Sequence, residues 1–234
     1  MEPAAGRRPS RVRRFGLVVL HRFGRVEHVH RRWRGRRSVE RQQLGRRQLL
    51  TAPLVVVSGP PASGKTTVAV PLATALRLPL VAKDLVKEAL MDSLGAEDVD
   101  QSRRLGQATF AVILALARSH LETGAGLVLE ANFALGRSEP GLRQLVAAAS
   151  HAVVVHCWAP REVLAERYRA RAGAGHRHPG HHDRLRLESG LPWLEPPATE
   201  PPDLGVPCLR VDTADHWDLE AIAAWVRETA AYIR

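Results

Sequence analysis

A glycine-rich segment that contains a lysine and a hydroxyl side chain is the stretch best suited to chemistry. Residues 59–66 fit the pattern G-x-x-x-x-G-K-[ST], with an apolar run before them and a helical pattern after them. Loop amides in this context converge on an anion at the start of the next helix. Lys65 can then reach the β- and γ-phosphates, and the Thr66 hydroxyl can bind Mg²⁺. We predict a nucleoside triphosphate site rather than a Gly-Pro turn, formed by Gly59, Pro60, Pro61, Ala62, Ser63, Gly64, Lys65, Thr66 and Thr67.

Strand-like and helix-like patterns alternate around this loop, which indicates a parallel sheet covered by helices. The apolar runs that predict strands occupy residues 54–58, 79–82, 127–130, 152–158 and 206–212. Helices are expected near residues 64–76, 84–90, 102–122, 138–149 and 217–233, and from residue 161 onward. The loop therefore joins the first strand to the first helix, at the edge where open α/β sheets bind their ligands.

Cysteine usage and hydropathy favour a protein of the reducing cytoplasm. Cys157 and Cys208 lie in apolar runs, which predicts two buried thiols rather than a disulfide or a metal pair. No apolar run approaches 18 residues and no export signal is recognised, so we expect no membrane-spanning segment and no membrane partner. The six prolines of residues 192–207 predict an irregular, exposed connector.

The positive charge of the chain is concentrated in its N-terminal segment. The formal net charge is +10, but residues 1–48 hold fifteen Arg and three Glu, whereas residues 49–234 hold 19 basic and 21 acidic residues. Such a segment is typical of an unstructured extension, of translated sequence upstream of the true start, of a transit peptide or of an arm that binds nucleic acid. We favour the first two. The prediction is one α/β domain over residues 49–234, with residues 1–48 dispensable.

Other motifs narrow the chemistry at the loop. The Asn-Lys-x-Asp pattern of GTPases, the Leu-Ser-Gly-Gly-Gln run of ABC-type ATPases and an apolar strand ending in Asp-Glu are all missing. Present instead are Asp84 with a basic residue three positions later, Leu-Glu-Ala-Asn at residues 129–132 and an Arg-rich segment before Arg-His-Pro-Gly-His. With the loop, these features make residues 50–234 resemble the small P-loop kinases of the AAA-domain-like group, which includes bacterial antibiotic phosphotransferases and polynucleotide 5′-hydroxyl kinases.

This resemblance implies a fold and a reaction. The fold is a three-layer α/β sandwich whose five-stranded parallel sheet has the order 2-3-1-4-5, as in nucleoside-kinase-like proteins. The reaction is transfer of the γ-phosphoryl group of ATP, with Mg²⁺, to a hydroxyl group. A small-molecule acceptor is preferred over a polynucleotide end, because residues 49–234 have no net positive charge and aromatic residues make up only 5% of the chain. A non-catalytic ATP-binding module is the other class left open.

The resemblance also assigns roles to residues that follow the second and third predicted strands. Asp84 matches the carboxylate that accepts the proton of the acceptor hydroxyl, and a helix N-cap is its alternative role. Lys87 stands where polynucleotide kinases have Arg, and would contact the acceptor as a point charge. Glu130 and Asn132 match an acidic-x-Asn pair near Mg²⁺ and the acceptor. Because relatives usually carry Asp at the first of these positions, Glu130 is expected to reach the metal through water.

Residues 161–190 are expected to form a lid over the phosphates. Arg167 and Arg171 lie four residues apart, share a helix face and are implied to be catalytic, and Arg177 is implied to bind the nucleotide. A solvated basic helix face is the alternative. The histidines at positions 176, 178, 181 and 182 lack the usual spacing of zinc ligands, so a lid or acceptor-binding role is favoured for them.

Overall fold

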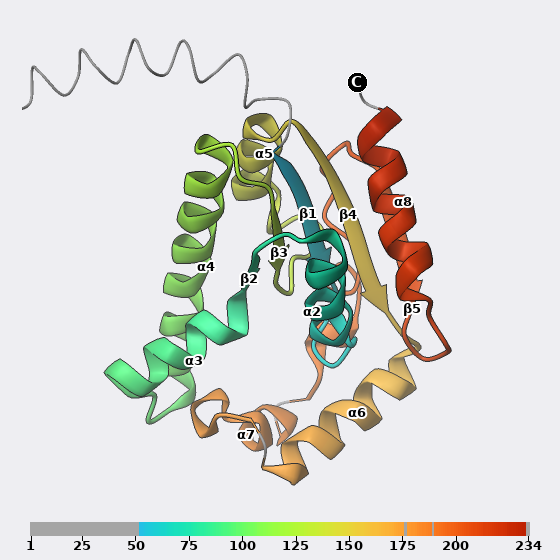
Figure 1. Cartoon of the computed structure of the whole chain (residues 1–234). Coiled ribbons are helices and arrows are strands. Elements are labelled where there is room, and N and C mark those ends of the chain that lie inside the picture. The colour runs from blue at the N-terminus through green and yellow to red at the C-terminus, as the bar shows by residue number, and fades with distance from the viewer. Residues whose placement is uncertain (1–51, 176, 189, 233–234) are drawn as a thin grey trace, which may run out of the picture. The chain divides into compact units, whose positions relative to one another are not determined.

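In the computed structural model, the valine-rich run before the loop forms the central strand of a five-stranded sheet (Figure 1). All four strand pairs are parallel, and the predicted order, β2-β3-β1-β4-β5, is confirmed. The strands are β1 (Pro53–Ser58), β2 (Leu80–Ala82), β3 (Leu127–Glu130), β4 (His151–Trp158) and β5 (Cys208–Asp212).

The structure describes residues 52–232 except positions 176 and 189, with the backbone alone for residues 230–232. The predicted extension, residues 1–48, lies outside the described residues, so its expected dispensability stays a prediction. No helix in the described part of the chain combines the length and the apolar character needed to cross a membrane.

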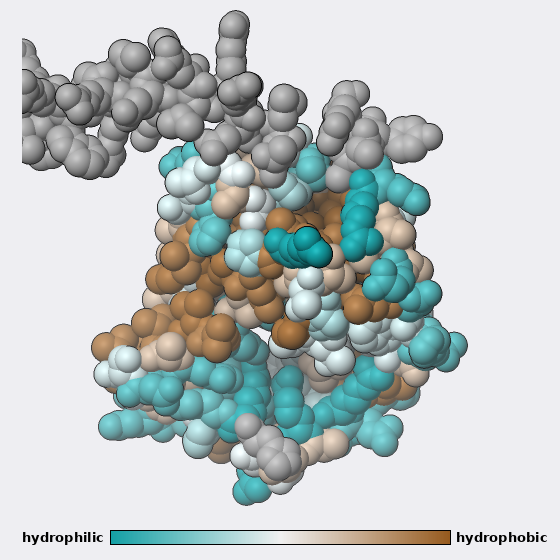
Figure 2. All heavy atoms as spheres, viewed as in Figure 1, coloured by the Kyte–Doolittle hydropathy of each residue, from teal (hydrophilic) through white to brown (hydrophobic). Residues whose placement is uncertain are grey.

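The described helices fall into three groups. α2 and α8 cover one face of the sheet, α4 and α5 cover the other, and α3, α6 and α7 lie beyond the carboxyl ends of the strands (Figure 1). Figure 2 shows that hydrophilic residues gather where the third group lies, and that the surface is hollowed between this group and the sheet. The helices are α2 (Lys65–Leu76), α3 (Lys83–Leu94), α4 (Val99–Glu122), α5 (Glu139–Ala148), α6 (Arg161–Ala174), α7 (Asp183–Glu188) and α8 (Leu219–Tyr232), with short 3-10 helices η1 (Pro179–His181) and η2 (Pro192–Leu194).

Two apolar cores lie on the two faces of the sheet. Leu54 and Val56 of β1 pack in the core formed with α4 and α5, whereas Val55 and Val57 pack in the core formed with α2 and α8. Successive side chains of a strand point to opposite faces, so a strand covered on both faces must be apolar at every position. This burial holds the carboxyl edge of the sheet as a rigid platform.

Two expectations about exposure need correction. Cys157 of the inner strand β4 is buried as predicted, but Cys208 is exposed, because β5 is an edge strand and Cys208 is its first residue. The proline-rich connector is also less exposed than predicted. Leu194 is only 3% exposed, and the Thr199 carbonyl accepts a hydrogen bond from the His156 ring. The connector is thus fastened to the sheet.

Candidate active site

The loop between β1 and α2 depends on glycine at two positions. Gly59 has a φ of 147°, and a Cβ there would overlap the carbonyl oxygen of Cys157 on β4. Gly64 has a φ of 73° and occupies the N-cap position of α2. Residues that carry a side chain rarely adopt either of these backbone conformations. The loop can therefore pass close to β4 and place Lys65 and Thr66 in the first turn of α2.

The carboxyl end of β3 brings a carboxylate to this loop, because Glu130 pairs in register with Val57 of β1. Glu130 is 2% exposed, its Oε2 accepts a hydrogen bond of 3.3 Å from Thr66 Oγ1, and its Oε1 lies 3.7 Å from Lys65 Nζ. Burial raises the pKa of Glu130, and Lys65 opposes this effect. The structure thus brings Lys65 together with Thr66 and Glu130, the two predicted metal ligands.

Asp84 lies in the first turn of α3, directly after β2. Ala82 occupies the N-cap position of α3, so the alternative role of Asp84 as a helix cap is wrong. The Asp84 carboxylate instead accepts hydrogen bonds from Lys83 Nζ, at 3.4 Å, and from Arg177. Burial alone would raise the pKa of Asp84, but Arg177, Lys83 and Lys65 together hold it well below its usual range. Asp84 is therefore ionised and paired with a residue of the expected lid.

Asp183, at the start of α7, connects other residues of the expected lid. Its carboxylate accepts hydrogen bonds from the Tyr168 hydroxyl at 2.9 Å and from Arg177 at 3.1 Å, and Arg171 Nε lies 3.4 Å away. The Arg171 guanidinium also lies 4.7 Å from the centre of the Tyr168 ring. In the described part of the chain, Arg171 Nε and one terminal nitrogen are buried without a hydrogen-bond partner. Arg171 Nε is still paired electrostatically with Asp183, whereas the terminal nitrogen keeps donors that an anion could accept.

Arg167, one turn before Arg171 on α6, contacts the loop indirectly. It donates hydrogen bonds to the Thr213 hydroxyl at 3.1 Å and to the Thr213 carbonyl at 2.6 Å. The Thr213 hydroxyl in turn donates to the Ser63 carbonyl of the loop at 2.9 Å. Arg167 and Arg171 both line a cavity of about 380 Å³ with loop residues, which we call the loop cavity. The predicted shared helix face thus lies over the loop.

A second cavity, of about 90 Å³, gathers seven of the predicted nucleotide, catalytic and acceptor residues at the carboxyl edge of the sheet; we call it the small chamber. They are Pro61, Lys65, Asp84, Lys87, Asn132, Arg171 and Arg177. Lys65 and Arg171 also line the loop cavity, so the two cavities share a wall.

Lys87 carries its charge in a buried position of the small chamber. Its side chain is 4% exposed, and its Nζ donates a hydrogen bond of 2.9 Å to Ser102 Oγ of α4. Burial lowers the pKa of Lys87 to about 8, and the nearby charges of Lys83 and Arg186 act in the same direction.

The described histidines between α6 and α7 contact α3 and the turn that follows it. His181 Nε2 lies 2.8 Å from Glu88, His178 Nε2 lies 3.1 Å from Asp92, and His182 Nε2 donates to the Ala96 carbonyl at 2.9 Å. His176 lies outside the described residues. Within the described ranges, no group of three His, Cys, Asp or Glu side chains could hold a metal ion. His178, His181 and His182 therefore link residues 161–190, which we call the lid segment, to α3 and the turn that follows it.

With this geometry in place, the family can be stated. Residues 54–197 match the model of a family described as AAA domain. The chain belongs to this family. The match includes the loop, Asp84, Glu130 and the whole of α6, and no curated protein matches the chain.

Solved structures similar to this AAA-domain protein include kinases. A protein from Chloroflexus aurantiacus, provisionally named a kinase, is 36% identical with a TM-score of 0.68, over 76% of this chain and 98% of that chain. A gluconokinase from Sinorhizobium meliloti is 25% identical with a TM-score of 0.46, over 80% and 95% of the two chains. An APS kinase from Mycobacterium tuberculosis is 18% identical with a TM-score of 0.49, over 77% and 98%. The family match and the first of these structures confirm the resemblance to small P-loop kinases.

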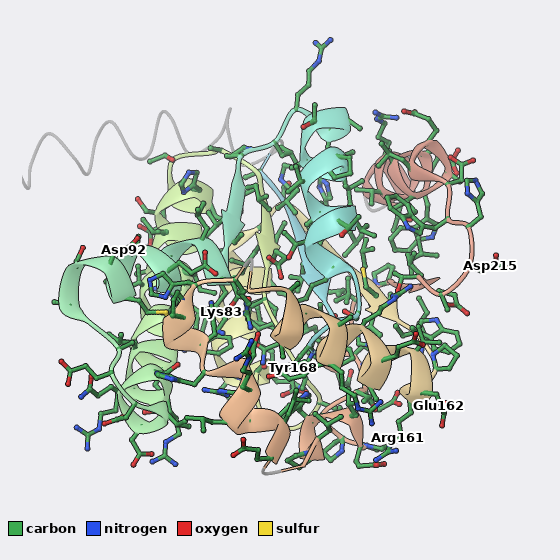
Figure 3. The ribbon with its side chains drawn as sticks, turned by 90° about the horizontal axis from the view of Figure 1, so that it is seen from below. Lys83, Asp92, Arg161, Glu162, Tyr168 and Asp215 are labelled. Carbon is green, nitrogen blue, oxygen red and sulfur yellow. The ribbon has the colours of Figure 1, made fainter. Side chains whose placement is uncertain are left out.

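Sequence reasoning missed several residues at the site of this AAA-domain protein. The sequence did contain a signal for Lys83, because this lysine directly precedes Asp84, with which it pairs. Thr213 and Trp193 had none, since they come from distant segments without a motif and reach the cavities only through the fold. Figure 3 shows Lys83, the first residue of α3, and Tyr168, a residue of α6, near the middle of the carboxyl edge.

Proposed function

We propose that the protein is a kinase that uses Mg²⁺ and ATP to phosphorylate a hydroxyl group of a small molecule, in the cytoplasm. The observation that carries this proposal is the small chamber, which is lined both by Lys65 of the phosphate-binding loop and by Asp84. Phosphoryl transfer requires a γ-phosphate, an acceptor oxygen in line with it and a proton acceptor beside that oxygen. The small chamber could hold the γ-phosphate and the acceptor oxygen beside Asp84, the proton acceptor.

In the proposed reaction, the loop and Lys65 bind the phosphates of ATP, and Asp84 orients the acceptor hydroxyl. The acceptor oxygen forms a bond to the γ-phosphorus, and the bond to the β,γ-bridging oxygen breaks. ADP leaves with that electron pair, and the hydroxyl proton passes to Asp84. Arg171 and Arg177 stabilise the negative charge on the transferred group. An Arg177 that turns toward the phosphoryl group would release Asp84 and raise its pKa, which makes it a better proton acceptor.

Thr66 and Glu130 are the residues that would hold Mg²⁺. A hydroxyl and a carboxylate are the oxygen ligands this ion prefers, and Mg²⁺ commonly takes only one or two protein ligands beside phosphates and water. The hydrogen bond between Thr66 and Glu130, and the lysine beside it, support this assignment. When bound, the ion supplies charge neutralisation for the phosphates.

The first test replaces the proposed proton acceptor. In Asp84→Asn we expect transfer of radiolabelled γ-phosphate to fall by about 10²–10⁴-fold, while ATP binding persists. The control is Asp215→Asn, an exposed carboxylate at the rim of the carboxyl edge (Figure 3), which should transfer like the parent. Normal transfer by Asp84→Asn would remove Asp84 from the mechanism.

A companion variant tests the loop. Lys65→Ala should lower transfer by about 10²-fold or more, because Lys65 contacts charge that moves during the reaction. Circular dichroism should show an unchanged fold, because Lys65 is the first residue of α2 and lies at the site rather than in the apolar core. ATP use equal to that of the parent would contradict the site. Label that passes from ATP only to water, whatever acceptor is offered, would instead favour a non-catalytic module.

A further inference from the structure

A third cavity adjoins the small chamber and shares no lining residue with the loop cavity; we call it the large cavity. It measures about 650 Å³, within the usual range for sites that bind drug-sized molecules. Pro61, Asn132 and Trp193 line both this cavity and the small chamber, so these residues form a junction between the two. The three cavities thus follow one another in the order loop cavity, small chamber, large cavity.

The wall of the large cavity is mostly apolar. It combines α4, the segment after β3 and the η2 region, and its large apolar side chains include Phe110, Leu114, Phe133, Leu135 and Trp193. The rings of Phe110 and Phe133 are 5.8 Å apart, a contact that gives the wall a fixed aromatic surface.

Charge is sparse in the large cavity compared with the small chamber. Among the residues that the structure describes, Arg137 and Glu195 are the only charged ones in its lining, and Glu195 pairs with Arg161 at 2.7 Å. The small chamber, in contrast, has six lysine and arginine residues and two aspartates in its lining. Charged and apolar parts of a ligand would therefore be sorted into different cavities. The phosphoryl group suits the small chamber, and an apolar group suits the large cavity.

We propose that the acceptor is an alcohol with an apolar, ring-containing body, and that this body occupies the large cavity while the hydroxyl passes the junction to reach Asp84. This inference rests on the proposed function and adds the substrate class. A sugar acid or the end of a polynucleotide would place charged or strongly hydrated groups against Phe110, Phe133 and Leu135, where they would lose water without gaining partners.

Trp193 has the largest side chain of the three residues that line both cavities. Its ring packs on Tyr168 with centroids 5.3 Å apart, and its indole N–H has no hydrogen-bond partner in the described part of the chain. The ring is therefore held by packing, and it presents an apolar surface at the junction. Tyr168 also contacts Arg171 and Asp183, so the junction is coupled to the lid segment.

The test compares alcohols that share one reactive end. 2-(2-Naphthyl)ethanol, 2-phenylethanol, ethylene glycol and 3-hydroxypropionate all carry a hydroxyethyl group, and a dinucleotide with a free 5′-hydroxyl is added. Binding to the full-length protein with Mg²⁺ and a non-hydrolysable ATP analogue is measured by calorimetry, and transfer is measured with labelled ATP. We expect the naphthyl alcohol to bind most tightly and the phenyl alcohol next. Tighter binding of 3-hydroxypropionate or of the dinucleotide would overturn the inference.

Matched variants locate the binding to the large cavity. Leu135 and Leu116 have similar exposure, 37% and 41%, but only Leu135 lines this cavity. Leu135→Asp should weaken binding of the two aromatic alcohols by about tenfold or more and leave ethylene glycol unchanged, whereas Leu116→Asp should change neither. If Leu135→Asp unfolds, Trp193→Ala serves in its place. Equal effects of Leu135→Asp and Leu116→Asp would refute the assignment.

The same measurements separate this inference from the proposed function. Aromatic alcohols that bind in a manner sensitive to Leu135→Asp, but receive no label, would contradict the kinase and leave the large cavity as an apolar ligand site. Labelled products whose formation is insensitive to Leu135→Asp would support the kinase and contradict the role of the large cavity.

Discussion

The cations of the small chamber differ in how their charge is balanced. Arg177 is shared by two carboxylates, Asp84 and Asp183. Lys87, in contrast, donates to the neutral hydroxyl of Ser102 and is almost completely buried. A buried ammonium group facing a hydroxyl is easily deprotonated, which is why the pKa of Lys87 falls to about 8. Its charge therefore depends on pH near neutrality.

This dependence gives a prediction at the scale of one residue. As the pH rises through about 8, Lys87 loses its proton and the small chamber loses positive charge, so kcat/KM of the parent should fall. Lys87→Arg keeps its charge throughout this range, so its profile should stay flat to about pH 9. The measurement is a pH profile of transfer for both proteins. Lys83, whose pKa burial also lowers, lies nearby, and an equal fall in Lys87→Arg would assign the loss to Lys83 instead.

At the scale of elements, the contact between the lid segment and α3 follows a helical repeat. Glu88 and Asp92, the partners of His181 and His178, are four residues apart and so lie on one side of α3, and Ala96, the partner of His182, lies just beyond the end of this helix. The lid segment is thereby held along α3 rather than at a single point.

Removing one of these contacts should loosen the lid segment. In Glu88→Ala, the His181 ring loses its side-chain partner, and a lost hydrogen bond of this kind costs about 1 kcal/mol. We expect trypsin to cleave the lid segment, at the bond after Arg177, about fivefold faster than in the parent. Glu122→Ala, an exposed change in the last turn of α4, is the control and should cleave at the parental rate. Equal rates in Glu88→Ala and the parent would show that this contact does not hold the segment.

How much could be predicted from the sequence depends on how far apart along the chain the interacting residues lie. β1 and its loop were predictable because each depends on a short apolar run or on a local motif, whereas the strand order came only from the resemblance to small P-loop kinases. The position of Asp84 and Glu130 at one edge of the sheet was predictable, because Asp84 comes shortly after β2 and Glu130 ends β3, and the carboxyl ends of parallel strands define one edge. The pairing of Arg177 with Asp84 was not predictable, since the two are 93 residues apart and no local pattern links them. The exposure of Cys208 was missed because an apolar run does not reveal that its strand lies at an edge.

At the scale of the molecule, a buried histidine ties the sheet to the connector. His156 of β4 is fully buried, its Nδ1 accepts a hydrogen bond from Ser58 Oγ, and its Nε2 donates to the Thr199 carbonyl, both at 2.9 Å. Burial lowers the pKa of His156 to about 4, so the ring is neutral in the folded protein at neutral pH. The connector that carries the η2 region is thus linked to the central part of the sheet.

This neutral ring should make stability depend on pH. Between about pH 6.5 and pH 4, the unfolded chain binds a proton at His156 that the folded protein does not bind, so the free energy of unfolding should fall as the pH falls. The difference in pKa corresponds to about 3 kcal/mol for His156. His181, whose pKa is lowered to about 3, adds to the loss.

Denaturant unfolding at several pH values checks this prediction. His156→Gln, which keeps a donor and an acceptor but does not titrate, should flatten the dependence between pH 6.5 and pH 4. His216→Gln, at an exposed histidine, should keep the parental slope. A parental slope in His156→Gln would show that other groups cause the acid sensitivity.

The ion pair between Arg177 and Asp84 couples the position of the lid segment to the proton affinity of Asp84. Arg177 favours the charged form of Asp84, and by thermodynamic reciprocity the charged form of Asp84 must favour the bound position of Arg177 by the same factor. A proton on Asp84 therefore weakens the hold on Arg177, and a departing Arg177 strengthens the hold of Asp84 on a proton. If a hydroxyl gives up its proton to Asp84 during transfer, the same event loosens Arg177, so completion of the chemistry itself promotes opening and release of the product.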